Sequence, residues 1–231
     1  MTNIIDMNEL QKSKYDHRDT YVIRLIVGAA AICVFFLMHY LYTSGIGLRF
    51  DLAVGETMRS LRSPSLNAIM IPITHTANWK TLVGIAVILL IIDAVKWKKI
   101  IYPLATAACI INLLIYKLFK ALVQRPRPDR SFWLVLENGF SFPSGHSMNG
   151  MFCYGMMIYL LWRNCENKMI RNLVTVFLCI LIPLIALSRV YCGVHHPTDV
   201  IAGLSAGLAM LMVSTVILDE IMLLIDKKPT A

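Results

Sequence analysis

The polar residues of this chain gather in three short clusters that interrupt long apolar stretches. The clusters lie at residues 120–128, 143–146 and 188–199. Together they supply imidazoles, a carboxylate, guanidinium and ammonium groups, and a glycine-bearing turn. Because ionisable side chains are costly at membrane depth, their presence between apolar stretches indicates function. These groups predict a site that holds a phosphate and transfers it to histidine.

The first cluster follows the third apolar stretch directly, so we expect Lys120 to lie on the last helical turn. Pro126 and Pro128 cannot continue a helix, and they stiffen the chain that leaves it. Arg127 presents a planar group suited to bidentate phosphate contacts, and Lys120 presents a point charge. Taken alone, a basic helix end is more typical of a topology signal or a lipid-headgroup anchor.

The second cluster places a proline, a hydroxyl and a glycine immediately before the fourth apolar stretch. Such a helix N-terminus exposes backbone N–H groups and binds anions. Ser144 offers a hydroxyl donor, and Gly145 lets the backbone approach an oxyanion closely. His146 then lies at the mouth of the site. The alternative is an interfacial histidine that is bonded to a neighbouring carbonyl.

The third cluster joins the fifth and sixth apolar stretches, with Arg189 at the end of one and Asp199 at the start of the next. Asp199 follows His195 by four residues, with a proline-enforced turn between them. We therefore expect the carboxylate to bond one ring nitrogen of His195 and to leave the other free and more basic. His196 is a second candidate nucleophile, but the spacing favours His195. Asp199 also fits a helix cap, and that role is compatible with catalysis.

The residue types alone support two histidines with separate tasks. His195, oriented by a carboxylate, can attack phosphorus, and His146, beside an anion site, can move a proton. Phosphoryl transfer depends mainly on positioning and charge stabilisation, which cations and helix N–H groups supply. A histidine pKa of about 6.5 suits acid–base work near neutrality. Because the sequence has no cluster of Asp and Glu to hold magnesium beside the phosphate, we expect a reaction without a metal or another cofactor.

The composition favours an all-α, polytopic membrane protein with six transmembrane helices. Hydrophobic residues make up 57% of the 231 residues and the mean hydropathy is +0.64, whereas soluble domains are about 45–50% apolar. The apolar stretches are 25–42, 81–95, 100–118, 147–162, 172–187 and 200–218. A bilayer crossing needs about 20 residues, so the second, fourth and fifth stretches must extend into flanking sequence or thin the bilayer. A soluble helical bundle is the alternative, but apolar residues surround these helices on all faces.

The distribution of basic residues orients these helices. The N-terminal segment and the short loops at 96–99 and 163–171 are basic and fall on one side of six spans, together with 226–228. The positive-inside rule then places both termini in the cytoplasm and the polar clusters on the extracytoplasmic side. All three clusters fall on the same side of the membrane. An odd number of spans between any two of them would place those two on opposite sides. These loops carry much of the net charge of +8, so the charge does not indicate a nucleic-acid partner.

One membrane domain at 21–220 is expected between a polar N-terminal segment, 1–20, and a C-terminal tail, 221–231. The polar segment is expected to be frayed or to lie on the surface. The apolar run at 25–42 is longer than that of a signal peptide, and no clear small-x-small cleavage site follows it. We therefore interpret this run as a retained anchor that crosses the lipid bilayer.

Three further patterns concern packing rather than chemistry. Residues 64–75 have the apolar spacing of an interfacial helix, and Asn78 is a candidate cap for the next span. Small residues at 202–203 and 206–207 predict a close approach by another helix. The six cysteines show no C-x-x-C spacing, which supports neither a disulfide framework nor a zinc site.

Taken in order, the three clusters resemble the tripartite signature of the type 2 phosphatidic acid phosphatases. K-x6-RP covers 120–128, PSGH covers 143–146 and SR-x5-H-x3-D covers 188–199. This superfamily includes bacterial undecaprenyl-diphosphate and phosphatidylglycerophosphate phosphatases, glucose-6-phosphatase and vanadium haloperoxidases. All three motifs are intact and at the family spacing, and the six-helix layout extends the resemblance over most of the chain.

The resemblance implies a mechanism and a set of site residues. The catalytic group would comprise His195 as the nucleophile that forms a phosphohistidine, Asp199 as its orienting carboxylate, and His146 as the acid and then the base. The phosphate oxygens would be bound by Lys120, Arg127, Ser144, Gly145 and Arg189. The family needs no metal for this reaction. Its membrane members place the site at the bilayer surface, where a lipid enters sideways between helices.

The substrate that the resemblance implies is a phosphorylated membrane lipid: an isoprenoid diphosphate, phosphatidic acid or phosphatidylglycerophosphate. A lipid phosphotransferase, in which another acceptor replaces water, would use the same intermediate. A transporter or headgroup-binding scaffold would use the cations only for affinity, and it leaves the spacing of His195 and Asp199 unexplained. Haloperoxidase chemistry is disfavoured because those relatives are soluble. The sequence indicates nothing about the oligomeric state.

Overall fold

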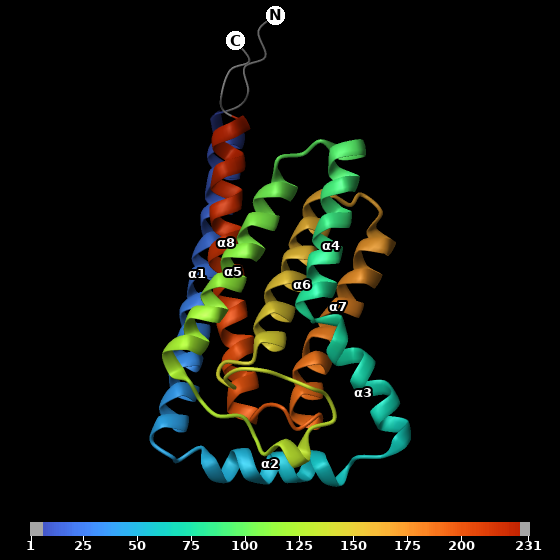
Figure 1. Ribbon diagram of the computed structural model, residues 1–231. Helices are drawn as coiled ribbons and strands as arrows, with labels where there is room; N and C mark the ends of the chain where they lie inside the picture. The colour runs from blue at the N-terminus through green and yellow to red at the C-terminus, as the bar shows by residue number, and fades with distance from the viewer. Residues whose placement is uncertain (1–6, 227–231) are drawn as a thin grey trace, which may run out of the picture.

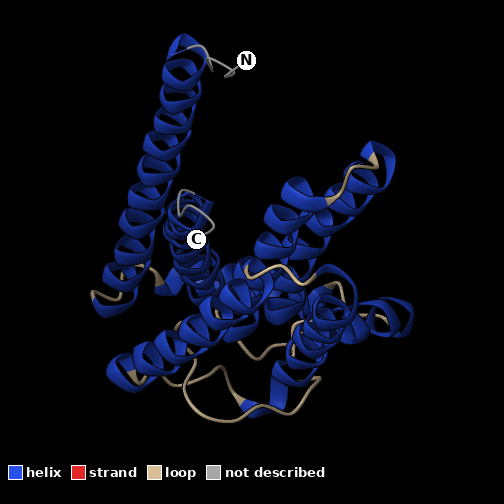
Figure 2. Ribbon diagram, turned by 90° about the horizontal axis from the view of Figure 1, so that it is seen from above, coloured by secondary structure: helices blue, strands red, loops and turns tan. Residues whose placement is uncertain are grey.

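The computed structural model describes residues 7–226, with side chains described from Thr20 to Ile225. These residues form helices and loops without a strand (Figure 2), which confirms the all-α prediction. The helices are α1 (Met7–Thr43), α2 (Leu48–Ser60), α3 (Pro64–Thr76), α4 (Trp79–Ile92), α5 (Ile101–Val123), α6 (Gly145–Asn164), α7 (Lys168–Tyr191) and α8 (Pro197–Asp226). A π-helical turn, Asp93–Trp97, extends α4, and a short 3-10 turn, Arg130–Phe132, lies between α5 and α6.

Local sequence signals set several of the helix ends. At the start of α3, the side chain of Ser63 accepts a hydrogen bond of 3.2 Å from the backbone N–H of Leu66, and Pro64 occupies the first turn. This confirms the helix expected at 64–75. At the end of α5, Gln124 adopts a left-handed conformation with φ of 50°, and the proline-rich segment follows. Lys120 therefore lies on the last turn of α5, as predicted.

Helix α6 is the centre of the bundle and packs against α5, α7 and α8. Its contact with α8 is close because α8 carries glycine where the helices meet. A Cβ on Gly203 would lie 2.5 Å from the carbonyl oxygen of Ser144, and one on Gly207 would lie 2.5 Å from that of Met148. The stripe of small residues on α8 therefore acts in packing, as predicted.

Six membrane spans are not confirmed. Among the described residues, four helices are long and apolar enough to cross a membrane: Thr20–Thr43 of α1, then α5, α7 and Pro197–Ile225 of α8. Helices α3 and α4 pass the same test only together, with a bend of 53° between them, which gives up to five spans. The fourth expected span, α6, is more polar because its first turns carry Ser147 and Asn149. Since its neighbours enclose it, this helix does not need an apolar face toward lipid.

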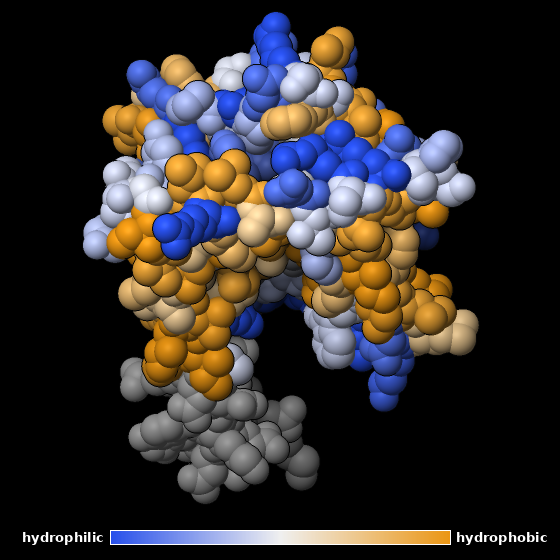
Figure 3. Space-filling view, turned by 90° about the horizontal axis from the view of Figure 1, so that it is seen from below, coloured by the Kyte–Doolittle hydropathy of each residue, from blue (hydrophilic) through white to orange (hydrophobic). Residues whose placement is uncertain are grey.

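The two ends of the bundle differ (Figure 1). Helix α1 begins and α8 ends at one end, and the two helices pack along each other. The polar clusters and α2 lie at the opposite end. Seen from that end, hydrophilic residues gather between the hydrophobic sides of the helices (Figure 3). Because α1 begins at Met7 and α8 ends at Asp226, both helices continue past the domain limits expected at 20 and 220. The remainder of the expected terminal segments, 1–6 and 227–231, lies outside the described residues.

Candidate active site

Four helix termini converge where the polar clusters meet (Figure 1). Helices α5 and α7 end there, and helices α6 and α8 begin there. The alternating directions of these helices bring segments that are far apart in the sequence to one end of the bundle. The site is therefore built from a loop after α5, the first turn of α6 and the connection between α7 and α8.

His195 lies in the connection between α7 and α8 and is almost fully buried, with 2% of its surface exposed. Its Nδ1 lies 3.5 Å from Oδ2 of Asp199, which is longer than a normal hydrogen bond. The hydroxyl of Ser141 lies beside both groups: it donates a 2.5 Å hydrogen bond to Oδ2 of Asp199 and is 3.3 Å from Nδ1. The other ring nitrogen, Nε2, lies 3.0 Å from Nη1 of Arg127. The ring therefore has a carboxylate on one side and a guanidinium on the other.

Asp199 is fully buried within a network that reaches helix α2. Its carboxylate accepts hydrogen bonds from Arg125 at 2.7 Å and from the backbone N–H of His196 at 2.8 Å. Arg125 also forms an ion pair of 2.7 Å with Asp51 of α2. Asp51 in turn accepts a hydrogen bond from the backbone N–H of Thr198 in the first turn of α8. Asp199 thus helps to fix the start of α8 while it faces the histidine, so the two roles expected of it are compatible.

The PSGH segment forms the start of α6. Ser144 occupies the N-cap position, and its hydroxyl accepts a 2.9 Å hydrogen bond from the hydroxyl of Ser147. The backbone N–H of Ser144 donates to the carbonyl of Asp199 at 2.9 Å, which joins the starts of α6 and α8. Gly145 is required by a close contact, because a Cβ there would lie 2.6 Å from the ring of Tyr116.

Arg127 and Lys120 are held by backbone carbonyls of the loop before α6 and of the connection after α7. The guanidinium of Arg127 donates hydrogen bonds of 2.8–3.0 Å to the carbonyls of Asn138, Gly139 and Val194. Nζ of Lys120 donates a 2.5 Å hydrogen bond to the carbonyl of Phe140. In the described part of the chain, Lys120, Ser144 and Gly145 make no hydrogen bond to the ring of His195.

Arg189 is buried at the end of α7, with 1% of its surface exposed. Its guanidinium donates to the hydroxyl of Thr74 on α3 and forms an ion pair with Glu137. Its Nε is buried and has no hydrogen-bond partner among the described residues. An unpaired buried donor of this kind is costly unless a ligand or water satisfies it.

Glu137 is one of the site residues that the sequence analysis missed, together with Ser141 and Asp51. Its carboxylate pairs with Arg189, lies 3.6 Å from Nη2 of Arg127 and 3.8 Å from Nδ1 of His146. It therefore joins the second cluster to the other two. No periodic pattern marks this residue. The one available signal is that Glu137 is the only acidic residue between Asp129 and the PSGH segment.

The electrostatic environment favours a neutral His195. Burial lowers the pKa of His195 well below its usual range, and the positive charges of Arg127 and Lys120 lower it further. Burial also lowers the pKa of Arg127, although Glu137 opposes this change. A neutral imidazole beside several cations is suited to attack on an anionic phosphate. Among the residues with described side chains, no group of three or more His, Cys, Asp or Glu lies together as a metal site.

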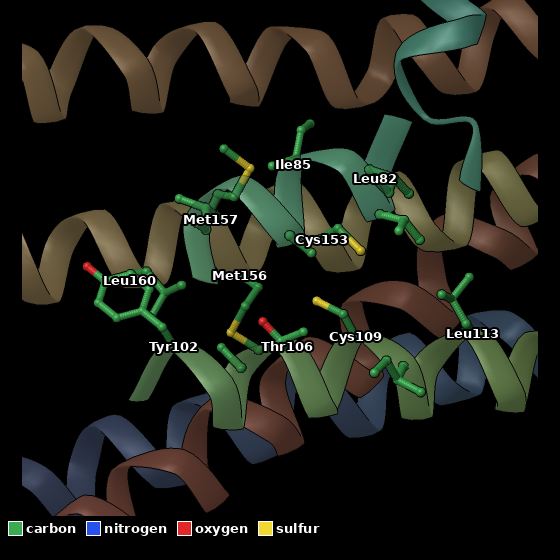
Figure 4. Close-up of a pocket in the computed structure, with 15 residues that line it drawn as sticks. Leu82, Ile85, Tyr102, Thr106, Cys109, Leu113, Cys153, Met156, Met157 and Leu160 are labelled. Atoms are coloured by element: carbon green, nitrogen blue, oxygen red, sulfur yellow. The ribbon is translucent and has the colours of Figure 1, made fainter. Parts of the chain in front are cut away.

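Cavities lie beside these groups and between the helices that carry them. One of about 210 Å³ is lined by His146, Arg189 and Glu137, and by the corner between α3 and α4. A second cavity, between α4, α5 and α6, is lined almost entirely by apolar side chains, including Leu82, Cys109 and Cys153 (Figure 4). The site therefore lies beside a polar cavity, and an apolar one lies between the helices that adjoin it.

Comparison with protein families finds one match that covers more than half of the chain. The family model described as the PAP2 superfamily matches residues 96–222. Among characterised proteins, phosphatidylglycerophosphatase B of Bacillus subtilis (strain 168) is 33% identical over 164 residues, which are 69% of this chain and 79% of the relative.

Two solved structures have a similar fold. The transmembrane PAP2-type phosphatidylglycerolphosphate phosphatase of Bacillus subtilis superposes with a TM-score of 0.71 and 28% identity, covering 94% of this chain and all of the other. Aquifex aeolicus LpxE superposes with a TM-score of 0.54 and 21% identity, covering 71% of this chain and 93% of the other. The second likeness concerns the fold alone.

Proposed function

The chain belongs to the PAP2 superfamily, and on this premise we propose that it is a membrane phosphatase that removes a phosphoryl group from a lipid. The two Bacillus subtilis relatives are named as phosphatases of phosphatidylglycerophosphate. The observation that carries the proposal is the position of His195. Its Nε2 faces Arg127 at 3.0 Å, whereas Nδ1 faces Asp199 and Ser141. Nδ1 is therefore oriented, and Nε2 points toward a cation that a phosphate oxygen would also contact.

The reaction proceeds in two steps. Nε2 of His195 attacks the phosphorus, and an N–P bond forms as the bond to the leaving oxygen breaks. His146 gives this oxygen a proton. Water then gives a proton to His146 and attacks the phosphohistidine, the N–P bond breaks, and phosphate leaves. Asp199 holds the Nδ1 side of the imidazole and stabilises the positive charge that develops there.

Positive groups stabilise the phosphoryl group during both steps. Arg127 and Arg189 offer planar donors, and Lys120 adds a point charge. Ser144 and the backbone of Gly145 contribute donors from the first turn of α6. The unpaired Nε of Arg189 supports this role, since a phosphate oxygen would satisfy it. Glu137 pairs with Arg189 and lies near Arg127. A bound phosphate would therefore replace part of these contacts.

The apolar side chains that line the small cavity of about 80 Å³ between α4, α5 and α6 are suited to contact with part of the hydrocarbon of the substrate (Figure 4). A lipid that reaches the site sideways can keep its chain among these helices while its phosphate meets the cations. We propose a phosphorylated lipid of the bilayer as substrate: an isoprenoid diphosphate, phosphatidic acid or phosphatidylglycerophosphate. No metal ion is needed by these steps, so we expect activity in EDTA and inhibition by vanadate, which resembles phosphate.

The membrane arrangement that fits this chemistry has six crossings, with α6 as the polar, enclosed one and with α3 and α4 together as one bent crossing. The membrane domain occupies 21–220. Both termini then lie in the cytoplasm, and the active site lies at the extracytoplasmic surface. The start of α1 and the end of α8 lie at the end of the bundle opposite the polar clusters, which supports this arrangement.

The test is to compare His195→Ala with His196→Ala, using a lipid labelled on its terminal phosphate. We expect His195→Ala to release no phosphate and His196→Ala to keep most of the activity. Wild-type protein denatured rapidly at alkaline pH should carry the label on residue 195, and labelled free phosphate rather than a labelled acceptor should identify hydrolysis. Both variants are first checked for the wild-type elution volume in detergent. Turnover by the correctly folded His195→Ala protein, or label on residue 196, would refute the mechanism.

A further inference from the structure

A groove between α6, α7 and α8 extends from the middle of the bundle toward the end opposite the active site. Its volume of about 450 Å³ lies within the range of about 300–1,000 Å³ that is typical of small-molecule sites. Its walls are mainly apolar, with Ile158 of α6, Ile182 of α7 and Leu211 of α8 among them. Trp162 and Cys179 also line the groove and are exposed. The groove therefore opens on the outside of the bundle, where a membrane protein meets lipid.

Charged and aromatic side chains lie where the groove approaches the far end of the bundle. Arg24 of α1 lines it there, together with Tyr159 and Trp162 of α6. Asp219 of α8 forms ion pairs with Arg24 at 2.6 Å and with Arg163. It also accepts a 2.7 Å hydrogen bond from the hydroxyl of Tyr159. One carboxylate is therefore shared by two guanidinium groups.

Arg171 supplies a further cation on the α7 side of the groove. Its guanidinium stacks on the ring of Trp162, 4.3 Å from the ring centroid, and Nε1 of Trp162 donates a 3.0 Å hydrogen bond to the hydroxyl of Thr175. Among the described side chains, that of Arg171 forms no hydrogen bond or ion pair, and its Nε is buried without a partner. Because a buried unpaired donor is costly unless a ligand or water satisfies it, an anion beside Trp162 would stabilise this arrangement.

The spacing along α7 aligns this cation with the groove. Thr175, Cys179 and Ile182 follow Arg171 at intervals of three or four residues, so all four lie on one side of the helix. The eleven residues from Arg171 to Ile182 span about 16–17 Å at 1.5 Å for each residue. The hydrocarbon of one leaflet is about 15 Å thick, which is half of the bilayer core. A lipid with its phosphate at Arg171 can therefore lay one acyl chain along the groove.

We propose that this groove binds one anionic phospholipid of the leaflet opposite the active site, with its phosphate at Arg171 and one acyl chain between α6, α7 and α8. A guanidinium is suited to bidentate contact with phosphate. Because Asp219 is already shared by two arginines, the charge of Arg171 is left for the lipid, which favours an anionic headgroup over a zwitterionic one. The bound lipid stabilises the folded protein. The inference does not depend on the proposed phosphatase function.

The test compares phosphatidylserine with phosphatidylcholine of the same acyl chains, each added to the full-length protein in a neutral detergent. Phosphatidylserine is anionic but has no terminal phosphate, so it is not a substrate of the proposed reaction. Arg171→Gln removes the charge, Arg171→Lys keeps it, and Cys179→Phe fills the groove. The matched controls are Arg49→Gln, at an exposed position of α2, and Val176→Phe, at an exposed position of α7 outside the groove. Thermal unfolding is measured for each protein with each lipid.

We expect phosphatidylserine to raise the unfolding midpoint by about 5 °C more than phosphatidylcholine does, the shift for a ligand at about a hundred times its Kd. Arg171→Gln and Cys179→Phe should remove most of this difference. Arg171→Lys should keep most of it, and both controls should keep all of it. Equal shifts with the two lipids, or a difference that either Arg171→Gln or Cys179→Phe retains in full, would overturn the inference. Phosphate release from a lipid substrate is a separate measurement, so such a result would leave the proposed function intact.

Discussion

Ser141 and Asp199 are joined by a 2.5 Å hydrogen bond from the serine hydroxyl to Oδ2 of the carboxylate. Both residues are fully buried, and the same hydroxyl lies 3.3 Å from Nδ1 of His195. The backbone N–H of Ser141 donates to the carbonyl of Arg125 at 2.7 Å. The serine therefore links the loop after α5 to the start of α8, and it holds the carboxylate and the imidazole in a fixed relation. We infer that Ser141 is a positioning residue for the nucleophile.

Replacing this serine tests the inference. Ser141→Ala should lower kcat about tenfold, equivalent to about 1.4 kcal/mol of transition-state stabilisation, and should leave KM within twofold. A hydrogen bond to a charged group has about this magnitude. Steady-state phosphate release measures both constants. Ser131→Ala, in the exposed turn before α6, is the control and should match the wild type. An unchanged kcat in Ser141→Ala would show that the carboxylate positions the ring without the serine.

The lowered pKa of His195 predicts the pH dependence of catalysis. The pH dependence of kcat/KM reports the pKa values of the free enzyme. Because the imidazole of His195 must be neutral to attack, kcat/KM should fall on the acid side only below pH 6.5. The positive charge of Arg127 contributes to this shift. Arg127→Gln should therefore lower kcat/KM and also move its acid limb to higher pH, whereas Arg127→Lys, which keeps the charge, should move it less. An acid limb that stays in place in Arg127→Gln would contradict this assignment.

The same shift affects stability. A histidine in the unfolded chain has a pKa of about 6.5. Below this pH the unfolded chain binds a proton, whereas buried His195 in the folded protein stays neutral. The folded state should therefore lose stability as the pH falls from about 6.5 toward the lower folded pKa. Thermal unfolding in detergent between pH 7 and pH 5 measures this loss, and it should be smaller in His195→Ala.

Glu137 predicts a competition between carboxylate and phosphate. Its carboxylate pairs with Arg189 and lies 3.6 Å from Arg127, two of the groups proposed to bind the phosphoryl oxygens. Glu137→Gln removes the negative charge and keeps the shape. Inorganic phosphate should then inhibit at a concentration about tenfold lower, a difference of about 1.4 kcal/mol. Inhibition constants for phosphate measure this effect. Weaker inhibition in the variant would indicate that Glu137 supports anion binding instead of opposing it.

The sequence predicted those parts of the site that depend on local spacing. The helix ends around Lys120, Gly145 and Asp199 follow from prolines, helix caps and the lengths of the apolar stretches. The even number of spans between the clusters predicts that all three clusters lie at the same end of the bundle. The six crossings stay a prediction, because only four of the described helices, or five with the bent pair, meet the length and hydropathy criterion, and α6 is not among them. Glu137 and Ser141 were missed because their loop has no periodicity. Glu137 meets Arg189 52 residues away, and Ser141 meets Asp199 58 residues away, so these contacts exist only once the bundle is assembled.

Asp51 was missed for a similar reason, and it leads to a prediction about stability. Its carboxylate pairs with Arg125 in a buried contact, 74 residues away in the chain. Removing one partner of a buried pair leaves an uncompensated charge and costs about 3–5 kcal/mol. In Asp51→Ala, Arg125 still forms its ion pair with Asp199. The variant should nevertheless lower the unfolding midpoint by about 10 °C, because each kcal/mol lowers it by about 2–4 °C in a chain of this size.

Thermal unfolding in detergent measures this effect, with a control on the same helix. Glu56 is exposed on α2, so Glu56→Ala should leave the midpoint unchanged. Asp51→Asn keeps an oxygen that can accept the N–H of Thr198 and should lose less stability than Asp51→Ala. Because Arg125 also holds Asp199, kcat should fall in Asp51→Ala even at temperatures where the protein stays folded. A midpoint and a kcat equal to those of Glu56→Ala would show that α2 does not support the site through this ion pair.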